Sequence, residues 1–173
     1  MWIFSQLSEA VVAFKDKTLA LAPFVCFINN YFEKAATSNE SKVDAISLLS
    51  NIFIFLSQEE RTFMVNSVGW CVLELVMSLL ISKQDKLVIW KCLDAMGSFI
   101  SVSDRFCAYV VEEKSLLFKF HKILTKGKLK HKKQVIWIVG NLISNSRKDA
   151  LEIAQNGLFN SIVIVLHDKK SDL

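Results

Sequence analysis

The chain has 173 residues, of which 52% are hydrophobic and 22% charged, with only five Gly and one Pro. This composition excludes a disordered chain, and the small number of turn-forming residues argues against a β-sandwich or a β-barrel. The net charge of +4 is too small to indicate nucleic acid as a main partner.

The hydrophobic pattern predicts an all-α fold. Apolar residues recur at helical spacing and are interrupted by turn-forming residues. The predicted helices cover residues 40–58, 61–66, 68–82, 85–101, 105–113, 114–126, 130–144, 148–156 and 158–168. Each cycle therefore consists of a long, a short and a medium helix. Ser103 and Ser146 are predicted N-caps, and Gly127 is a predicted left-handed C-cap.

A membrane-spanning segment is not expected. The longest stretch without a charged residue runs from Thr18 to Phe32 and contains Pro23. It is shorter than the roughly 18 to 20 apolar residues that a spanning helix needs. The first residues also lack the basic start of a signal peptide. We therefore expect an intracellular protein that does not associate with membranes.

Four segments of the chain are similar to one another, which indicates internal repeats. They begin at residues 2, 47, 94 and 137, so that successive starts differ by 45, 47 and 43 residues. Repeats of three helices in solenoid proteins have a period of about 40 to 47 residues. The fourth residue of each segment is Ser or Gly, which we expect to allow close approach of neighbouring helices. The repeats are predicted at residues 1–40 (partial), 41–84, 85–128 and 129–173, in a single domain.

The segment from Gln134 to Ser144 resembles a central armadillo repeat of the importin-alpha family, as do the segments at Trp2 and Leu93. The resemblance covers nearly the whole chain. It implies an armadillo-type right-handed helical solenoid of about four repeats, with incomplete terminal repeats. It also implies an adaptor that binds basic nuclear localisation signals in a concave groove, in the cytoplasm and the nucleus.

The resemblance implies a peptide-binding site built from a Trp and an Asn four residues later, which lie on one helix face. Indole rings would hold the stems of Lys and Arg, and amides would bind the peptide backbone. Asp94 and Asp104 would supply negative charge, although a solvated Asp94 and a helix-capping Asp104 are alternatives. The corresponding positions, including the substituted ones, are Trp2, Gln6, Asn51, Asp94, Ser98, Trp137 and Asn141, with Asp104 beyond the third segment.

Other features of the sequence predict no chemistry. The four cysteines are scattered and are interpreted as core residues, and the three histidines have no metal-ligand spacing. No motif of an enzyme appears, so we expect no catalysis, no metal and no cofactor. Residues 126–133 contain five lysines. We interpret this run as a solvated loop, with binding of phosphate or acidic partners, or use as a localisation signal, as alternatives.

The sequence therefore predicts a binding module rather than an enzyme. The leading hypothesis is recognition of basic extended peptides or localisation-signal cargo, with an import receptor as a further partner. The alternative is a divergent armadillo scaffold that binds other proteins without import activity. Both ends of the chain are apolar, which predicts that further repeats, self-association or a partner covers them.

Overall fold

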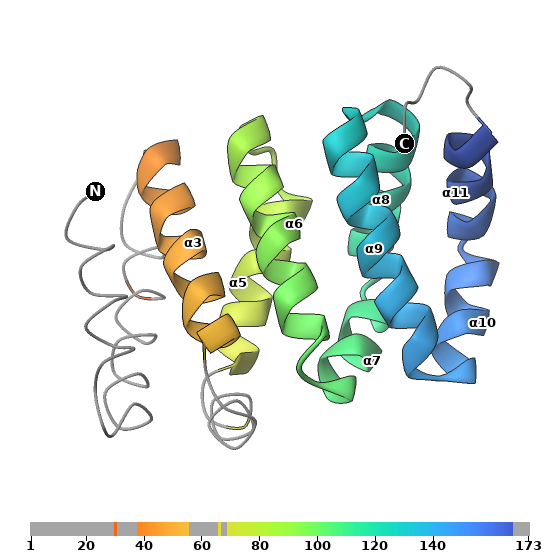
Figure 1. Cartoon of the computed structure of the whole chain (residues 1–173), viewed down its shortest axis with the longest axis horizontal. Coiled ribbons are helices and arrows are strands. Elements are labelled where there is room, and N and C mark those ends of the chain that lie inside the picture. Colours follow the sequence, from red (N-terminus) through yellow and green to blue (C-terminus); the bar gives the residue numbers. More distant parts are fainter. Residues whose placement is uncertain (1–29, 31–37, 56–65, 67–68, 168–173) are drawn as a thin grey trace. The chain divides into compact units, whose positions relative to one another are not determined.

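The computed structural model describes residues 30, 38–55, 66 and 69–167 (Figure 1). These residues form an all-α structure of packed helices, without a strand in the described ranges. None of the described helices is long and apolar enough to cross a membrane. The helices are α3 (Asn39–Phe55), α5 (Trp70–Ile81), α6 (Lys86–Ile100), α7 (Asp104–Glu112), α8 (Lys114–Lys126), α9 (Leu129–Asn145), α10 (Arg147–Gln155) and α11 (Leu158–His167).

The predicted order of helices is confirmed where the structure describes the chain. The long helices α3, α6 and α9 have 17, 15 and 17 residues, and the short helices α7 and α10 have nine residues each. Helix ends differ from the predicted ends by a few residues at most. The predicted helix at residues 61–66 lies outside the described residues, apart from residue 66.

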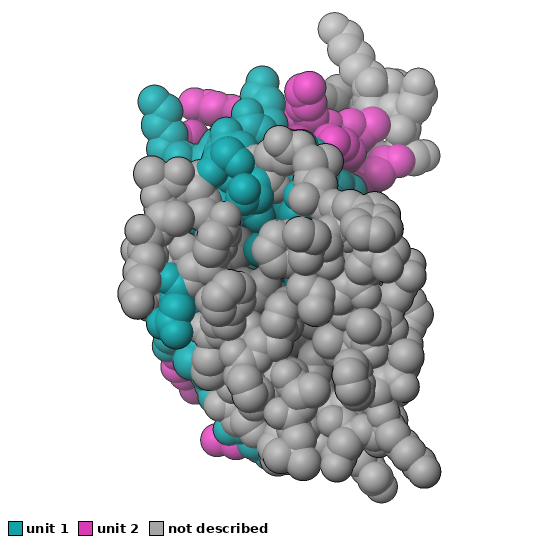
Figure 2. All heavy atoms as spheres, turned by 90° about the vertical axis from the view of Figure 1, so that its left-hand side faces the viewer, with its two compact units in different colours: residues 1–99 teal, residues 100–173 magenta. Residues whose placement is uncertain are grey.

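The chain divides into two compact units, Met1–Phe99 and Ile100–Leu173, which Figure 2 colours separately. In the first unit, the Lys42 ammonium group donates a hydrogen bond to Gln84 Oε1 at 3.2 Å, which ties α3 to the segment between α5 and α6. The predicted repeat boundaries and the single solenoid domain stay predictions. The buried side chains of this unit include Ala45, Ile46, Val72, Leu73, Val76, Leu80, Val88, Leu93, Met96 and Phe99.

In the second unit, α9 contacts α7, α8 and α10, and α11 packs against α8 and α10. The short helices α7 and α10 also contact each other. Apolar residues at helical spacing produce this packing, because they form one continuous face on each helix. The buried face of α9 contains Val135, Ile138, Val139 and Leu142, and that of α8 contains Leu116, Leu117, Phe120, Ile123 and Leu124.

Polar side chains cap several helix starts. Ser146 Oγ accepts a hydrogen bond from the Asp149 backbone N–H at 3.0 Å, so its predicted N-cap role is confirmed. Asp85 and Glu113 accept in the same way at the starts of α6 and α8. Ser103 occupies the N-cap position of α7, but its hydroxyl makes no capping hydrogen bond in the described part of the chain. The predicted N-cap position of Ser103 is therefore correct, but the side-chain hydrogen bond expected of an N-cap is not formed.

The C-cap prediction for Gly127 is also wrong in mechanism. Gly127 follows α8 with φ −74° and ψ 164°, which is extended rather than left-handed backbone. A glycine is needed there for a different reason, because a Cβ atom would collide with the carbonyl oxygen of Ile123. The left-handed glycine is Gly157, after α10, with φ 73°.

Gly140 contradicts the predicted role of the small fourth residue in the repeated segments. It lies inside α9 and is exposed, and a Cβ there would meet no atom of another described element within 4 Å. Close approach of a neighbouring helix therefore does not explain this glycine.

These two glycines should respond in opposite ways to replacement by alanine. Gly127→Ala should lower the free energy of unfolding by about 1 kcal/mol or more, because the added Cβ strains the end of α8. Gly140→Ala should raise it by about 0.5–1 kcal/mol, because alanine is the better residue inside an exposed helix. Urea unfolding measures both changes in the free energy of unfolding. Equal effects of the same sign would contradict the different roles given to Gly127 and Gly140.

The two serines at equivalent helix starts form a second matched pair. Ser146→Ala should cost about 1 kcal/mol of unfolding free energy, since it removes the capping hydrogen bond of α10. Ser103→Ala should cost only a few tenths of that amount, because its hydroxyl does not cap α7. A thermal unfolding comparison in which Ser103→Ala is the more destabilising variant would refute this difference.

Candidate functional site

The predicted site residues lie in different parts of the structure. Asp94 and Ser98 are on α6 in the first unit, while Asp104, Trp137 and Asn141 are on α7 and α9 in the second. Asn51 lies on α3, but its side chain is outside the description, and Trp2 and Gln6 are outside the described residues. Their predicted peptide-binding roles stay predictions.

On α6, Asp94 and Ser98 are one helical turn apart, and both are half-buried. The Ser98 hydroxyl donates to the Asp94 backbone carbonyl at 3.2 Å. A serine that bonds its own helix in this way offers less to a ligand than an asparagine amide, which carries both a donor and an acceptor. This position is therefore a weaker candidate for backbone recognition than Asn141.

On α9, Trp137 has 47% of its surface exposed, so it is not a core residue of the described structure. Gly140 and Ser144 are exposed on the same face, and Asn141 is half-buried beside them. An exposed indole next to a residue without a side chain leaves room for a ligand group on its face. This arrangement is the candidate contact surface of α9.

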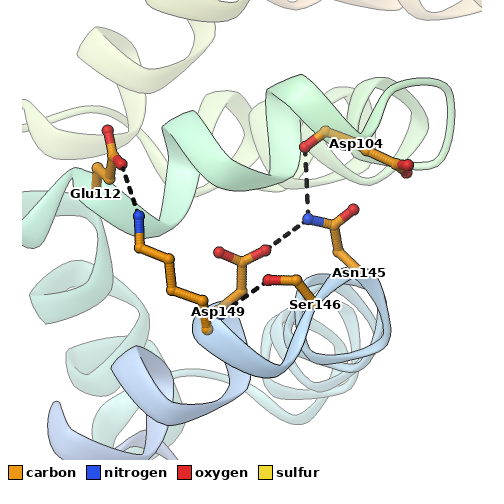
Figure 3. Close-up of polar contacts among 6 residues, drawn as sticks. Asp104, Glu112, Asn145, Ser146 and Asp149 are labelled. Atoms are coloured by element: carbon orange, nitrogen blue, oxygen red, sulfur yellow. Dashed lines mark hydrogen bonds and ion pairs between the residues drawn. The ribbon is translucent and has the colours of Figure 1, made fainter.

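A polar junction forms where α9 ends and α7 and α10 begin (Figure 3). The Asn145 side-chain N–H group donates to Asp149 Oδ2 at 2.5 Å and to the Asp104 backbone carbonyl at 3.5 Å. Asp149 is buried, with 4% of its surface exposed, and lies in the first turn of α10, where the helix dipole favours a negative charge. Lys148 and Glu112 form an exposed ion pair at 3.6 Å, which contributes little to stability.

The junction brings predicted and unpredicted residues together. Asp104 is the first residue of α7 and is exposed, and Ser103 rather than Asp104 occupies the N-cap position of that helix. Asn145, which the sequence analysis did not select, links Asp104 to α9. Its spacing was a usable signal, since Asn145 follows Asn141 by four residues and Trp137 by eight, and all three share one side of a helix.

The hydrogen bonds of Asn145 fix the orientation of its amide. Its nitrogen faces two acceptors, and the reversed amide would place an oxygen against a carboxylate. Asn145 Oδ1 is consequently a buried acceptor without a hydrogen-bond partner among the described residues. Asn141 Nδ2 is a buried donor that also has no hydrogen-bond partner there. Both atoms are enclosed by the protein, and they lie one helical turn apart on α9.

The lysine-rich run differs from its predicted loop structure. Only Gly127 and Lys128 lie between α8 and α9, and the rest of the run belongs to the two helices. His131 is buried, with 5% of its surface exposed, so the run is not a uniformly solvated segment. Lys130 and Lys133 are exposed on α9, seven and four residues before Trp137. They share the face of Trp137.

The cysteines were predicted to be core residues. This is confirmed for Cys92 and Cys107, whereas Cys71 is exposed and Cys26 is outside the described residues. Burial raises the pKa of the Cys92 thiol to about 12. Burial, together with the carboxylates of Asp104 and Asp149, raises the pKa of Cys107 to about 11. Neither buried thiol forms the reactive thiolate at neutral pH.

Within the described ranges, no three His, Cys, Asp or Glu side chains are grouped to hold a metal ion. The closest His–Ser contact joins His121 Nδ1 and Ser161 Oγ at 2.7 Å, where it links α8 to α11.

Alkylation with iodoacetamide should separate the cysteines. In the folded protein near neutral pH, Cys71 should react, while Cys92 and Cys107 should react only after denaturation; peptide mapping by mass spectrometry reads each site. The free energy of unfolding should fall as pH rises from about 9 towards 11, because thiols of the unfolded chain ionise there and the buried thiols do not. Rapid labelling of Cys92 in the native protein would contradict the burial.

Comparison with known proteins adds no family. No protein-family model, curated protein or solved structure matches the chain.

Proposed function

We propose that this chain is an armadillo-type adaptor that binds an extended peptide along α9. The repeated order of long, short and medium helices supports a solenoid. So do the contacts in the second unit, where the short helix α10 packs against the short helix α7 and the medium helix α11 packs against the medium helix α8. Such stacking of equivalent helices is what solenoid repeats require to bury their apolar faces.

The exposed indole ring of Trp137 carries the peptide-binding proposal, and unpartnered amide groups lie on the same side of α9. Buried polar atoms normally have hydrogen-bond partners, and an orphaned donor or acceptor costs about 1–3 kcal/mol. Asn141 Nδ2 and Asn145 Oδ1 both lack one among the described residues, and they lie one and two helical turns beyond Trp137, whose side chain is 47% exposed. Because both amide atoms are enclosed by the protein, the surface that a peptide meets is the indole ring with Gly140 and Ser144, which are exposed on the same face.

The biological setting in this proposal comes from the resemblance to importin-alpha. In that setting the peptide is a basic nuclear localisation signal, an import receptor is a further partner, and the protein works in the cytoplasm and the nucleus. Asp104, exposed at the start of α7 in the same unit as α9, is a carboxylate that supports a basic ligand. Opposite charges of this kind steer a ligand and select its sequence.

A second candidate is an armadillo scaffold without import activity, and the charges around Trp137 favour it. Lys133 is exposed one helical turn before Trp137 on the same face of α9, and its positive charge disfavours a basic peptide there. Exposed apolar side chains on α11 offer this scaffold a surface for self-association or for another protein. Val163, Ile164 and Leu166 have 50%, 67% and 55% of their surfaces exposed.

Titration of fluorescently labelled extended peptides tests the proposal. Peptides with a central aliphatic residue and either basic or neutral flanks should bind the folded wild type. The variant with Trp137→Ala and Asn141→Ala should bind about thirtyfold more weakly, since an interface Trp commonly contributes roughly 2 kcal/mol. Binding of the basic peptide alone would favour the import adaptor.

Phe118→Ala provides the matched control, because Phe118 is an aromatic residue of the same unit, 70% exposed, on α8 rather than on α9. This variant should bind like the wild type. Equal weakening by the control and the double variant, with unchanged circular dichroism, would refute a site at Trp137.

A further inference from the structure

The turn between α10 and α11 contains the one Asn-Gly pair of the sequence, Asn156 and Gly157. Asn156 is exposed, and Gly157 has left-handed backbone with φ 73°. A Cβ at Gly157 would meet no atom within 4 Å beyond its chain neighbours, so no other part of the described structure crowds this glycine. The pair is therefore open to water, and no side chain at residue 157 shields its backbone nitrogen.

Asparagine is among the thermolabile residues of proteins, and an asparagine before glycine reacts without an enzyme. The Gly157 nitrogen attacks the side-chain carbonyl carbon of Asn156, and the new C–N bond closes a succinimide ring. The bond from that carbon to Nδ2 breaks, and Nδ2 leaves as ammonia with the proton that the Gly157 nitrogen loses. Water then opens the ring: its hydroxyl adds to one of the two carbonyl carbons, and its proton returns to the nitrogen. Aspartate or isoaspartate remains at position 156.

The folded chain holds the two reacting groups apart. Asn156 Nδ2 donates to the Glu152 backbone oxygen at 2.8 Å and to Glu152 Oε1 at 3.2 Å. The Gly157 N–H group donates to the Ala154 backbone oxygen at 3.0 Å. Asn156 has ψ 3°, which eclipses its own backbone nitrogen with that of Gly157 and turns Cβ away from the attacking atom. Ring closure needs Cβ and the attacking nitrogen on the same side of the Cα–C bond, so the amide must first leave Glu152.

We propose that the turn of Asn156 and Gly157 is a site of spontaneous deamidation, and that Glu152 slows the reaction by holding the Asn156 amide. The reaction requires local opening at the C-terminal end of α10, and the open population falls with each hydrogen bond that must break. Glu152 is a positioning residue, because its oxygens hold Nδ2 and take no part in the bond changes. The site lies outside α9 and does not depend on a bound peptide.

The product changes the contacts of this turn. A carboxylate at position 156 replaces the donor Nδ2 by an oxygen that faces two oxygens of Glu152, so attraction becomes repulsion. The new charge also lies at the C-terminal end of α10, where the helix dipole disfavours a negative charge. In the isoaspartyl product, the main chain gains a methylene group directly before Gly157, whose carbonyl oxygen accepts from the Ser161 N–H group of α11. Deamidation therefore loosens the connection between α10 and α11.

Incubation of the folded protein in mildly alkaline buffer tests the site, with peptide mapping by mass spectrometry as the readout. Asn160 is the internal reference, because it is exposed on α11 and is followed by Ser161 rather than by glycine. Deamidation should be found at Asn156 and not at Asn160. It should be at least about fivefold slower in the folded protein than in guanidinium chloride, which is the factor that one typical hydrogen bond contributes.

Three variants test the role of Glu152, and circular dichroism checks that each one folds. Glu152→Ala should raise the rate at Asn156 in the folded protein about fivefold, because it removes the Oε1 acceptor. Glu152→Gln keeps a side-chain oxygen and should react at nearly the wild-type rate. Gln155→Ala is the matched control, because it changes an exposed side chain of α10 and leaves both hydrogen bonds to Glu152 in place.

Asn156→Asp carries the charge of the product and should lower the melting temperature by about 2–4 °C. An unchanged melting temperature would overturn the effect on the turn. Equal rates at Asn156 in the folded and the denatured wild type would overturn the protection by Glu152, and so would Glu152→Ala at the wild-type rate. If Asn156 stayed intact in both states, the site itself would be refuted.

Discussion

The packing of residues 100–167 depends on the two-sided character of α9. One side of this helix contributes Val135, Ile138, Val139 and Leu142 to the core, where α9 contacts α7, α8 and α10. Its opposite side leaves Trp137 largely exposed. A helix that is held by three neighbours presents its outer face in a fixed orientation, and rigid presentation reduces the entropy that a bound chain must lose. The same apolar spacing therefore sets both the core and the candidate site.

Helix positions could be predicted from the sequence because they depend on local spacing. Apolar residues three and four apart define the buried faces, and Gly and Ser mark the ends. The end of α8, next to Gly127, and the start of α11, next to Gly157, are examples. The detailed role of each end residue was harder to predict, because Gly127 is required by a collision with Ile123 rather than by its φ angle. That contact depends on the exact path of the backbone after the helix.

The candidate site was only partly predictable. Trp137 and Asn141 were selected through the resemblance to an importin-alpha repeat, whereas the contribution of Asn145 depends on Asp149 and Asp104, which come from two other helices. The direction of the Asn145 amide is a tertiary property that no local pattern contains. Lys133 and Trp137 both fall in the predicted helix at residues 130–144, so their common face could be predicted from helical spacing.

The different starts of the two short helices have a consequence for local unfolding. In α10, the first turn is held by the Ser146 hydroxyl and by the Asn145–Asp149 hydrogen bond, whereas the first turn of α7 has no side-chain cap in the described structure. Opening of a helix end exposes its amide hydrogens to solvent, so exchange with deuterium is faster where fewer bonds must break. The start of α7 therefore frays more readily than the start of α10. Of these two equivalent turns, the first turn of α7 is the one whose backbone adjusts at lower free-energy cost.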